Sequence, residues 1–399
     1  ANWTVSDNAT FTLGGNLSLG GGDSQLTVKD SAVVSIGGEF QIGNGAGNVG
    51  IVDIQGGTVT VNNWMSVGRQ DGTGSVTVSG GSLVKQGGGN LIIGDGTTGS
   101  MAVSGNGSVL ASSDIWVGYN NNGNGTLTIA GGSTEIMGVV IVARGNGSQG
   151  TLKLNEGILT ANGIQKGDNT GAGTAIVEFN GGTLRARTDS ADFISGFGAG
   201  DVVIQSGGLI FDTNGHAVAI SHGLTGTGGL TKVGAGDLLL SGTNAYTGAT
   251  VIEGGSLTLG GSNVIADASA VTLDGGTLNI NNFNETLAAL TLGSTSTIDF
   301  GNVPGANTLV FADSSGQAWS GSLILSNFEV GVDTLNFSSA DGLTLSQLSA
   351  ISVSGYYATG LTAGGDVVFA AVPEPEHFAI GALGVLGLAI LARRRRQHA

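Results

Sequence analysis

The sequence predicts an all-β protein folded as a parallel β-helix (β-solenoid), with coils of ~25 residues. Three observations support this. Glycine supplies 76 of the 399 residues while only 5% are aromatic, which favours a thin, long core over a thick globular one. Glycine-rich positions recur at one period. Within each repeat, apolar and polar residues alternate, as they do in half-buried strands.

Two independent sets of turn residues keep the same period. The first set is spaced by 24, 25, 26, 25 and 25 residues and reads Gly56-Gly57, Gly80-Gly81, Gly105-Asn106, Gly131-Gly132, Glu156-Gly157 and Gly181-Gly182. The second is spaced by 25, 26, 24, 25 and 24 residues and reads Gly43, Gly68, Gly94, Gly118, Ala143 and Gly167.

Three strand-like segments fit in each repeat, and their alternation predicts which side chains face inward. Before the first turn the inward residues are Val52/Ile54, Val76/Val78, Met101/Val103, Leu127/Ile129, Leu152/Leu154 and Val177/Phe179. After it they are Val59, Leu83, Val109, Ile136, Leu159 and Leu184. Before the second turn they are Phe40/Ile42, Met65/Val67, Leu91/Ile93, Ile115/Val117 and Val140/Val142.

Such repeats cannot bury their apolar faces alone, so we expect each strand to pair with its equivalent one coil away, ~4.8 Å along the axis. An antiparallel sandwich is the alternative, but its hairpins have no reason to keep a constant period. Roughly a dozen coils would give a rod on the order of 55–60 Å long. Lys166 stands where Val or Ile is expected, so we predict that it marks the last regular coil, with its amine at a solvent-facing corner.

Charge and cysteine content exclude several functions. The formal net charge is −16, and only 9 of the 13 basic residues precede Arg393, which excludes binding to a phosphate backbone. The absence of cysteine excludes disulfides, thiolate catalysis and Cys-ligated zinc. The chain begins with Ala-Asn-Trp rather than Met, as expected of a fragment or of a protein that has lost a signal peptide.

We divide the chain into residues 1–197, regular coils, and 198–299, continued β-helix without the 25-residue register. Residues 228–261 resemble the autotransporter-associated (passenger-associated) β-strand repeat, which occurs in secreted β-helices. The elements that carry the resemblance are Leu230, Thr231, Lys232, Gly234, Gly236, Leu238, Leu240, Gly242, Asn244, Tyr246, Gly248, Thr250, Gly255, Leu257 and Leu259.

A different composition marks the C-terminal end. Residues 300–371 are expected to form a β-rich terminal segment with an amphipathic stretch at 343–348, and 372–399 a sorting signal. Residues 378–392 carry no charge and predict a short membrane helix, ~22 Å long. The flanking arginines would mark its cytoplasmic side. The charged and proline residues of this signal are Pro373, Glu374, Pro375, Arg393, Arg394, Arg395 and Arg396.

This tail resembles the PEP-CTERM signal of exported Gram-negative proteins. The resemblance implies processing by an exosortase-type enzyme near Pro-Glu-Pro, anchoring in the inner membrane during transit, and a final place at the cell surface or outside the cell. A plain tail anchor is the alternative, but it leaves the Pro-Glu-Pro triplet unexplained.

The residues that could support chemistry are sparse. Arg185 and Arg187 could bind a uronate, although solvated charges are the simpler interpretation because no aspartate pair is expected beside them. His216 and His222, with Asp212 nearby, lack a convincing third metal ligand. We therefore predict no catalytic residue, no metal site and no cofactor.

One outward-facing column is apolar in three successive coils. Ile92, Trp116 and Ile141 should stack on the outside, with Val139 beside them and Trp64 on the same face. This ladder predicts a binding or packing patch for another chain, a folded-back segment or a sugar ring. Coverage by the chain's own loops, or an error in the register, is the alternative.

Together these features predict an exported, non-enzymatic surface or extracellular-matrix protein, a β-helical stalk or adhesin. The alternative is a carbohydrate-binding or carbohydrate-active β-helix of the polysaccharide lyase or hydrolase type. The expected partners are an exosortase-type enzyme, exopolysaccharide or other surface glycans, and the inner membrane before processing. No nucleic acid is expected.

Overall fold

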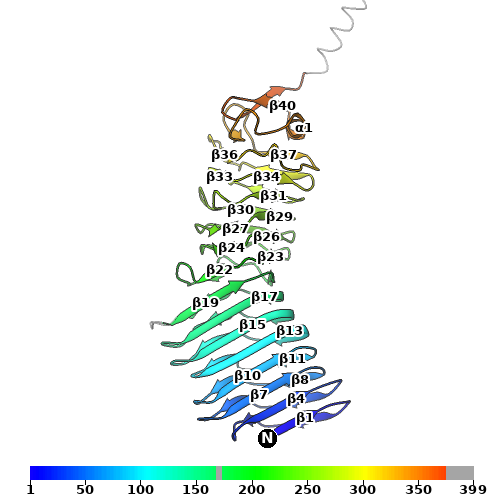
Figure 1. The fold of residues 1–399 in the computed structure, drawn as a ribbon, viewed down its shortest axis with the longest axis vertical. Helices are drawn as coiled ribbons and strands as arrows, with labels where there is room; N and C mark the ends of the chain where they lie inside the picture. The colour runs from blue at the N-terminus through cyan, green and yellow to red at the C-terminus, as the bar shows by residue number, and fades with distance from the viewer. Residues whose placement is uncertain (168–172, 374–399) are drawn as a thin grey trace, which may run out of the picture.

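A computed structural model describes residues 1–167 and 173–373. Strands of successive coils pair in parallel and build one solenoid of about 14 turns. The N-terminus lies at one end of the rod and the last strands lie at the other (Figure 1). The predicted fold class, an all-β parallel β-solenoid, is confirmed.

The largest sheet has 21 strands in two side-by-side ladders. The first ladder runs through β1 (Asn2–Val5), β4 (Ser24–Val28), β7 (Val49–Ile54), β10 (Thr73–Val78), β13 (Thr98–Ala111), β15 (Asn124–Ile136), β17 (Gln149–Ala161), β19 (Thr174–Phe179), β22 (Val202–Ile204), β25 (Thr225–Gly226) and β28 (Ala245–Tyr246). The second runs through β2 (Thr10–Leu13), β5 (Val33–Ile36), β8 (Thr58–Val61), β11 (Ser82–Lys85), β13, β15, β17, β20 (Thr183–Ala186), β23 (Leu209–Asp212), β26 (Leu230–Val233), β29 (Thr250–Ile252), β31 (Val271–Leu273) and β34 (Leu290–Leu292).

The strands β13, β15 and β17 belong to both ladders. In these coils the turn at Gly105-Asn106 and its equivalents bulges without ending the strand, and the pairing register shifts there. Three strands per coil were expected from the sequence, so this merging is a local correction. A bulge lets one strand bend around a corner while its ladder continues.

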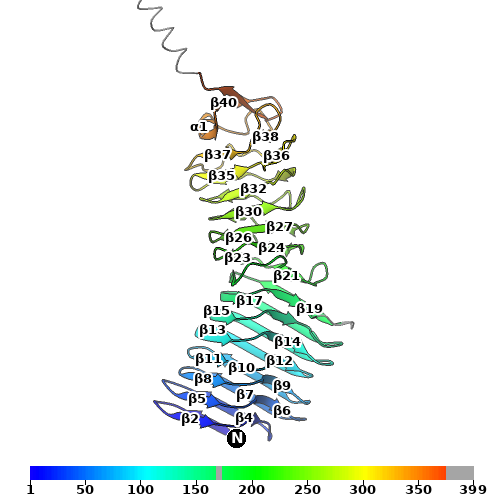
Figure 2. The ribbon, with the colours of Figure 1, turned by 180° about the vertical axis from the view of Figure 1, so that it is seen from behind.

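The third face of the wide coils is an eight-stranded sheet, which carries the groove described below. Its strands are β3 (Leu17–Leu19), β6 (Phe40–Asn44), β9 (Met65–Arg69), β12 (Leu91–Asp95), β14 (Ile115–Tyr119), β16 (Val140–Val142), β18 (Ile164–Lys166) and β21 (Ile194–Ser195). Figure 2 shows this face from behind the view of Figure 1.

The residues predicted to face inward are all buried, and the polar residues between them are half-buried or exposed. One assignment in the second column is wrong. Ile136 pairs with Ala111, and Thr134 takes the place opposite Val109, because the bulge after Gly131 moves the register by two residues. The hydroxyl of Thr134 is consequently buried without a partner among the described residues.

The coils become shorter after β18. Lys166 ends that strand, and the next partner of Ile164 in the sheet is Ile194, 30 residues later. The Lys166 side chain is 27% exposed and its amine lies 3.9 Å from Asp201, so the expected place at the end of the regular array is confirmed.

Beyond that point the period falls to about 20 residues, and the stack narrows above β22 (Figure 1). A nine-stranded sheet takes the place of the third face: β24 (Val218–Ile220), β27 (Asp237–Leu240), β30 (Ser256–Leu259), β32 (Thr277–Asn279), β35 (Ser296–Asp299), β37 (Leu323–Ser326), β39 (Ile351–Val353), β40 (Tyr356–Leu361) and β41 (Val367–Ala371). A three-stranded sheet comprises β33 (Glu285–Leu287), β36 (Thr308–Phe311) and β38 (Thr334–Asn336).

The described chain ends in a small cap. Parallel pairing continues past residue 300 to β39, after which β40 and β41 pair antiparallel. The amphipathic stretch expected at 343–348 largely overlaps the helix α1 (Leu345–Ser349), which begins with a capping box formed by Thr344 and Gln347.

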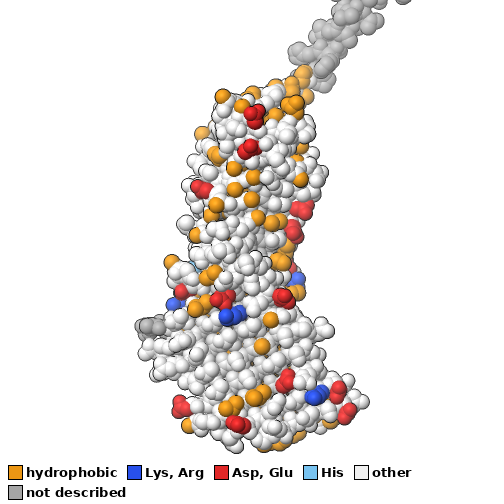
Figure 3. Space-filling view, in the orientation of Figure 1, with side chains coloured by type: hydrophobic (Ala, Val, Ile, Leu, Met, Phe, Trp, Pro, Cys, Tyr) orange, Lys and Arg blue, Asp and Glu red, His pale blue; other side chains and the backbone are white. Residues whose placement is uncertain are grey.

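Of the sorting signal, the structure describes Pro373, which is exposed, and the remainder lies outside the described residues. This includes Glu374, Pro375, the predicted membrane helix at 378–392 and Arg393 to Arg396. In the part of the chain that is described, no helix combines the length and the apolar character needed to cross a bilayer. Charged side chains on the described surface are few and scattered (Figure 3).

Candidate binding groove on the third face

Three columns of side chains face outward on the eight-stranded sheet. Because the strands pair in register, the residues of each column lie one coil apart. The column just before the strands reads Glu39, Trp64, Asn90, Asp114 and Val139. The central column reads Gln41, Ser66, Ile92, Trp116 and Ile141. The column at the strand ends begins Asn44, Arg69, Asp95 and Tyr119.

Ser66 is the smallest residue of the central column and leaves a hollow between its larger neighbours. This hollow, which we call the groove, has a volume of about 300 Å³. Its lining residues are Glu39, Trp64, Ser66, Arg69, Ile92, Asp95, Tyr119 and Asn120. Ligand sites of this kind combine apolar surface with a few placed polar groups.

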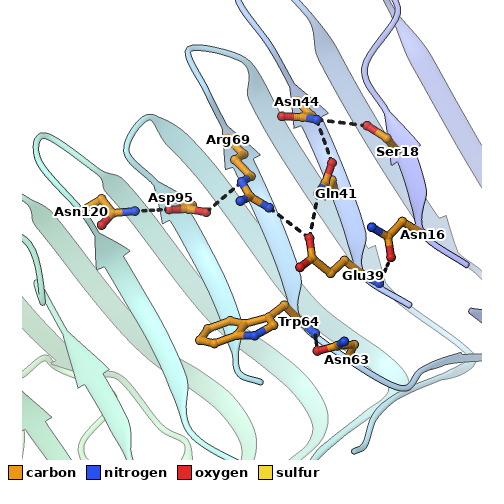
Figure 4. A network of polar contacts seen from close by, with 10 residues as sticks. All are labelled: Asn16, Ser18, Glu39, Gln41, Asn44, Asn63, Trp64, Arg69, Asp95 and Asn120. Carbon is orange, nitrogen blue, oxygen red and sulfur yellow. Dashed lines mark hydrogen bonds and ion pairs between the residues drawn. The ribbon is translucent and has the colours of Figure 1, made fainter. Parts of the chain in front are cut away.

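An ion-pair network crosses one side of the groove (Figure 4). The Arg69 guanidinium lies 3.3 Å from a Glu39 carboxylate oxygen and 3.5 Å from an Asp95 oxygen. Asn120 donates to the other Asp95 oxygen, and Gln41 donates to Glu39 over 2.8 Å. Arg69 is therefore held between two carboxylates from neighbouring coils.

The network continues toward the N-terminal coils. Asn44 donates to Gln41 over 2.8 Å and to Ser18 over 3.3 Å, and the Glu39 backbone N–H donates to Asn16 over 2.9 Å. Residues from five successive coils thus brace this wall. Its side chains are ordered by one another before any ligand arrives.

Trp64 forms the aromatic wall, and a buried lysine sets its position. A Cβ at Gly89 would lie 2.6 Å from two carbons of the Trp64 indole, so only a glycine backbone can approach that ring so closely. The loop that holds Gly89 is fixed by Lys85, whose fully buried ammonium donates to the carbonyls of Gln86, Gly88 and Gly89. Burial lowers the pKa of Lys85.

The structure confirms the order of the predicted apolar ladder but not its exposure. Trp116 pairs with Ile92 on one side and Ile141 on the other, yet Trp116 is only 7% exposed and Ile92 3%. The Arg144 guanidinium covers the Trp116 ring at 4.0 Å from its centroid. Tyr119 packs against the same ring at 4.7 Å between centroids.

Of the predicted patch, the half-buried Trp64, Val139 and Ile141 keep some accessible surface. Trp64 meets Trp116 edge to face, with ring centroids 5.6 Å apart. The groove therefore overlaps the predicted patch at Trp64 and Ile92, and Trp116 supports the aromatic wall from behind.

The other predicted sites are separated by the fold. Arg185 pairs with Asp212 across adjacent strands at 2.7 Å, which corrects the expectation that no aspartate lies beside it. Asp212 is thereby withdrawn from the histidines. Arg187 lies 3.8 Å from Glu135.

The two histidines do not form a metal centre. His216 contacts Asp189 at 3.1 Å, and burial lowers the pKa of His222. Over residues 1–167 and 173–373, no group of three His, Cys, Asp or Glu side chains could hold a metal ion.

Sequence reasoning missed Glu39, Arg69 and Asp95. The signal was the column that follows the second set of turn residues, in which Arg69 and Asp95 stand one period apart. Opposite charges directly across a ladder are a recognised source of sheet stability.

The coil at 228–261 explains the motif on which its resemblance rests. Leu230, Leu238 and Leu240 point into the core. The fully buried Lys232 donates to three carbonyls, those of Val233, Gly234 and Gly254. Other buried motif residues are Asn244, Tyr246, Thr250, Leu257 and Leu259.

Comparison with known proteins agrees with this resemblance. Residues 230–259 match the Passenger-associated-transport-repeat family. Over 221 residues the chain is 32% identical to the Adhesin BmaC autotransporter of Brucella suis biovar 1 (strain 1330), a match covering 50% of this chain and 6% of that protein. The chain thus spans a small part of that relative's length. No solved structure matches. Residues 230–259 therefore constitute a passenger-associated-transport-repeat, built into a parallel β-solenoid.

Proposed function

We propose that this protein is an exported, non-enzymatic, adhesin-like stalk at the surface of a Gram-negative cell. The observation that carries the proposal is the uninterrupted parallel pairing from β1 to β39, with the repeat built into it. Such a stack is long and stiff, because each coil packs on both neighbours. The match to part of an autotransporter adhesin supports the same function.

The arrangement of charges supports binding over catalysis. The two carboxylates of the groove each use an oxygen to pair with Arg69. Hydrolases and lyases need acid and base groups directed at the substrate. The alternative kept from the sequence, a carbohydrate-active enzyme, is therefore the weaker one, whereas carbohydrate binding is favoured by the groove itself.

The route to the surface is also a proposal. Pro373-Glu374-Pro375, the apolar segment 378–392 and Arg393 to Arg396 support sorting by an exosortase-type enzyme after a stop in the inner membrane. Each arginine at a bilayer centre costs ~2.5 kcal/mol or more, so four in succession resist transfer. Surface glycans or exopolysaccharide are the proposed partners there.

Surface labelling tests the stalk proposal. Antibody against residues 1–167 should label intact producing cells, and external protease should release solenoid peptides without lysis. Beads coated with the purified protein should adhere to surfaces that these cells colonise. Labelling that requires permeabilised cells would contradict the proposal.

A separate pair of variants tests sorting. Replacing Arg393 to Arg396 by Ser should reduce membrane retention and processing. Altering Pro373, Glu374 and Pro375 should leave retention intact and block cleavage. Mass spectrometry of released protein decides the matter, since a mature form still ending at Ala399 would overturn sorting and indicate a plain anchor.

A further inference from the structure

We infer that the groove is a saccharide subsite that takes one uncharged pyranose unit of a glycan. The inference rests on the proposed adhesin-like function, whose ligand class it names. Three features of the groove carry it: an aromatic wall, a set of unengaged polar atoms, and the sign of the local charge.

The aromatic wall is fixed in place before binding. Gly89 abuts the Trp64 indole and Trp116 packs against it at an interplanar angle of 66°. The part of the ring left uncovered lines the groove. Trp and Tyr rings are wide apolar platforms with a polar edge, and the C–H face of a pyranose offers a matching flat apolar surface.

The polar atoms that remain available match a ring of hydroxyls. Within the described residues, four groove atoms make no hydrogen bond: Glu39 Oε1, Ser66 Oγ, Arg69 Nη2 and the Tyr119 hydroxyl. They comprise a carboxylate acceptor, a guanidinium donor and two hydroxyls that do both. A sugar hydroxyl also donates and accepts, so neighbouring hydroxyls can engage the carboxylate and the guanidinium together.

The charge of the groove selects against anionic sugars. Glu39 and Asp95 contribute two negative charges and Arg69 one positive charge, which leaves −1, and the whole chain carries −16. Arg69 is already paired with both carboxylates. A uronate or a sulfated sugar would have to displace one of them and would be repelled by the other.

The volume sets the number of units. A groove of about 300 Å³ lies at the lower limit for small-molecule sites, so it holds one ring, with the rest of the glycan outside. Such a contact is weak by itself, and repeated contacts along a polymer or among several stalks would strengthen it.

Titration of the whole protein with defined oligosaccharides tests the inference. The probes are neutral oligomers of glucose, galactose and mannose, together with oligomers of the corresponding uronic acids. Saturation-transfer NMR reports contact, and calorimetry gives the affinity. We expect at least one neutral oligomer to bind, and uronic acid oligomers to bind at least about tenfold more weakly than that oligomer.

Two variants locate the site. Trp64→Ala should weaken binding by about tenfold. Ser66→Ile fills the floor with the residue type found one coil later at position 92, and should abolish binding while the melting temperature holds. Trp3→Ala removes an exposed tryptophan of the first strand and should change nothing.

The inference is overturned if no neutral oligomer binds, if uronic acid oligomers bind as well or better, or if Ser66→Ile binds normally. Its failure is distinct from that of the stalk proposal, because surface labelling and protease release do not depend on the groove. Labelled intact cells without saccharide binding would sink this inference alone.

Discussion

The ammonium of Lys85 donates a hydrogen bond to the carbonyl of Gly89, 2.9 Å away. Gly89 in turn lies against the indole of Trp64. A buried cation inside the solenoid thus determines where an aromatic ring stands on its outside. Lys85 makes its bonds within its own loop, whereas Lys232 in the narrow half also reaches Gly254 in the next coil.

Lys85→Met should loosen the loop and the ring together. The variant leaves carbonyl groups without their donor, which we expect to lower stability by roughly 1–3 kcal/mol. Fluorotryptophan NMR resolves the 4 tryptophans of the chain, and the Trp64 signal should shift and broaden.

Lys232→Met is the matched control, because it removes an equivalent set of bonds far from Trp64. Its melting temperature should fall while the Trp64 signal stays in place. An unmoved Trp64 signal in Lys85→Met would show that the lysine does not position the ring.

Glu285 should make the solenoid less stable as the pH rises. Its side chain is fully buried, and burial raises the pKa of its carboxyl from 4.5 to about 7 despite hydrogen bonds from the Val264 and Ile265 N–H groups. The folded state therefore keeps a proton that the unfolded chain releases. Between pH 4.5 and 7 stability should fall by about 3 kcal/mol.

Glu285→Gln isolates this effect from the other carboxylates. The variant should match the parent near pH 4 and exceed its stability by about 3 kcal/mol at pH 8. Chemical denaturation across this range measures the difference. A difference that does not change with pH would contradict the assignment.

Val103→Asp should unfold the wide coils. Val103 is fully buried and pairs with Ile129 of the next coil, so an aspartate there would place an unpaired charge in the core, at a cost of several kcal/mol. Ile129→Asp should act in the same way. Circular dichroism should show loss of β structure.

Thr128→Asp is the control for both, since Thr128 faces outward beside Lys153 on the same strand pairing. Its spectrum and melting temperature should hold. Retained β structure and an unchanged melting temperature in Val103→Asp would contradict the inward register.

The period and alternation of the sequence were sufficient to predict the stack and its inward columns. Each coil repeats the same local pattern, so burial at Val103 follows from its own repeat and from the coils above and below. The end of the regular array at Lys166 was visible for the same reason, as a charged residue in an apolar column.

Burial of Trp116 could not be predicted from its column. Its cover consists of Arg144 and Tyr119, whose side chains reach across from neighbouring coils. Lys85 and Lys232 were equally hidden, because alternation assigns lysine to the outside unless the carbonyls of a corner are known to surround it. Such contacts depend on side-chain direction at turns, where the period-two pattern carries no information.

Spin-label distances along the rod test the central claim most directly, namely that successive coils stack in one register. The chain has no cysteine, so Asp53→Cys with Glu178→Cys gives clean labelling of two outward positions. They are five paired strands apart, through Thr77, Ala102, Thr128 and Lys153. We predict a backbone separation of ~24 Å, and ~19 Å when Lys153→Cys replaces Glu178→Cys. Two distances that do not differ by about one strand spacing would contradict the stack.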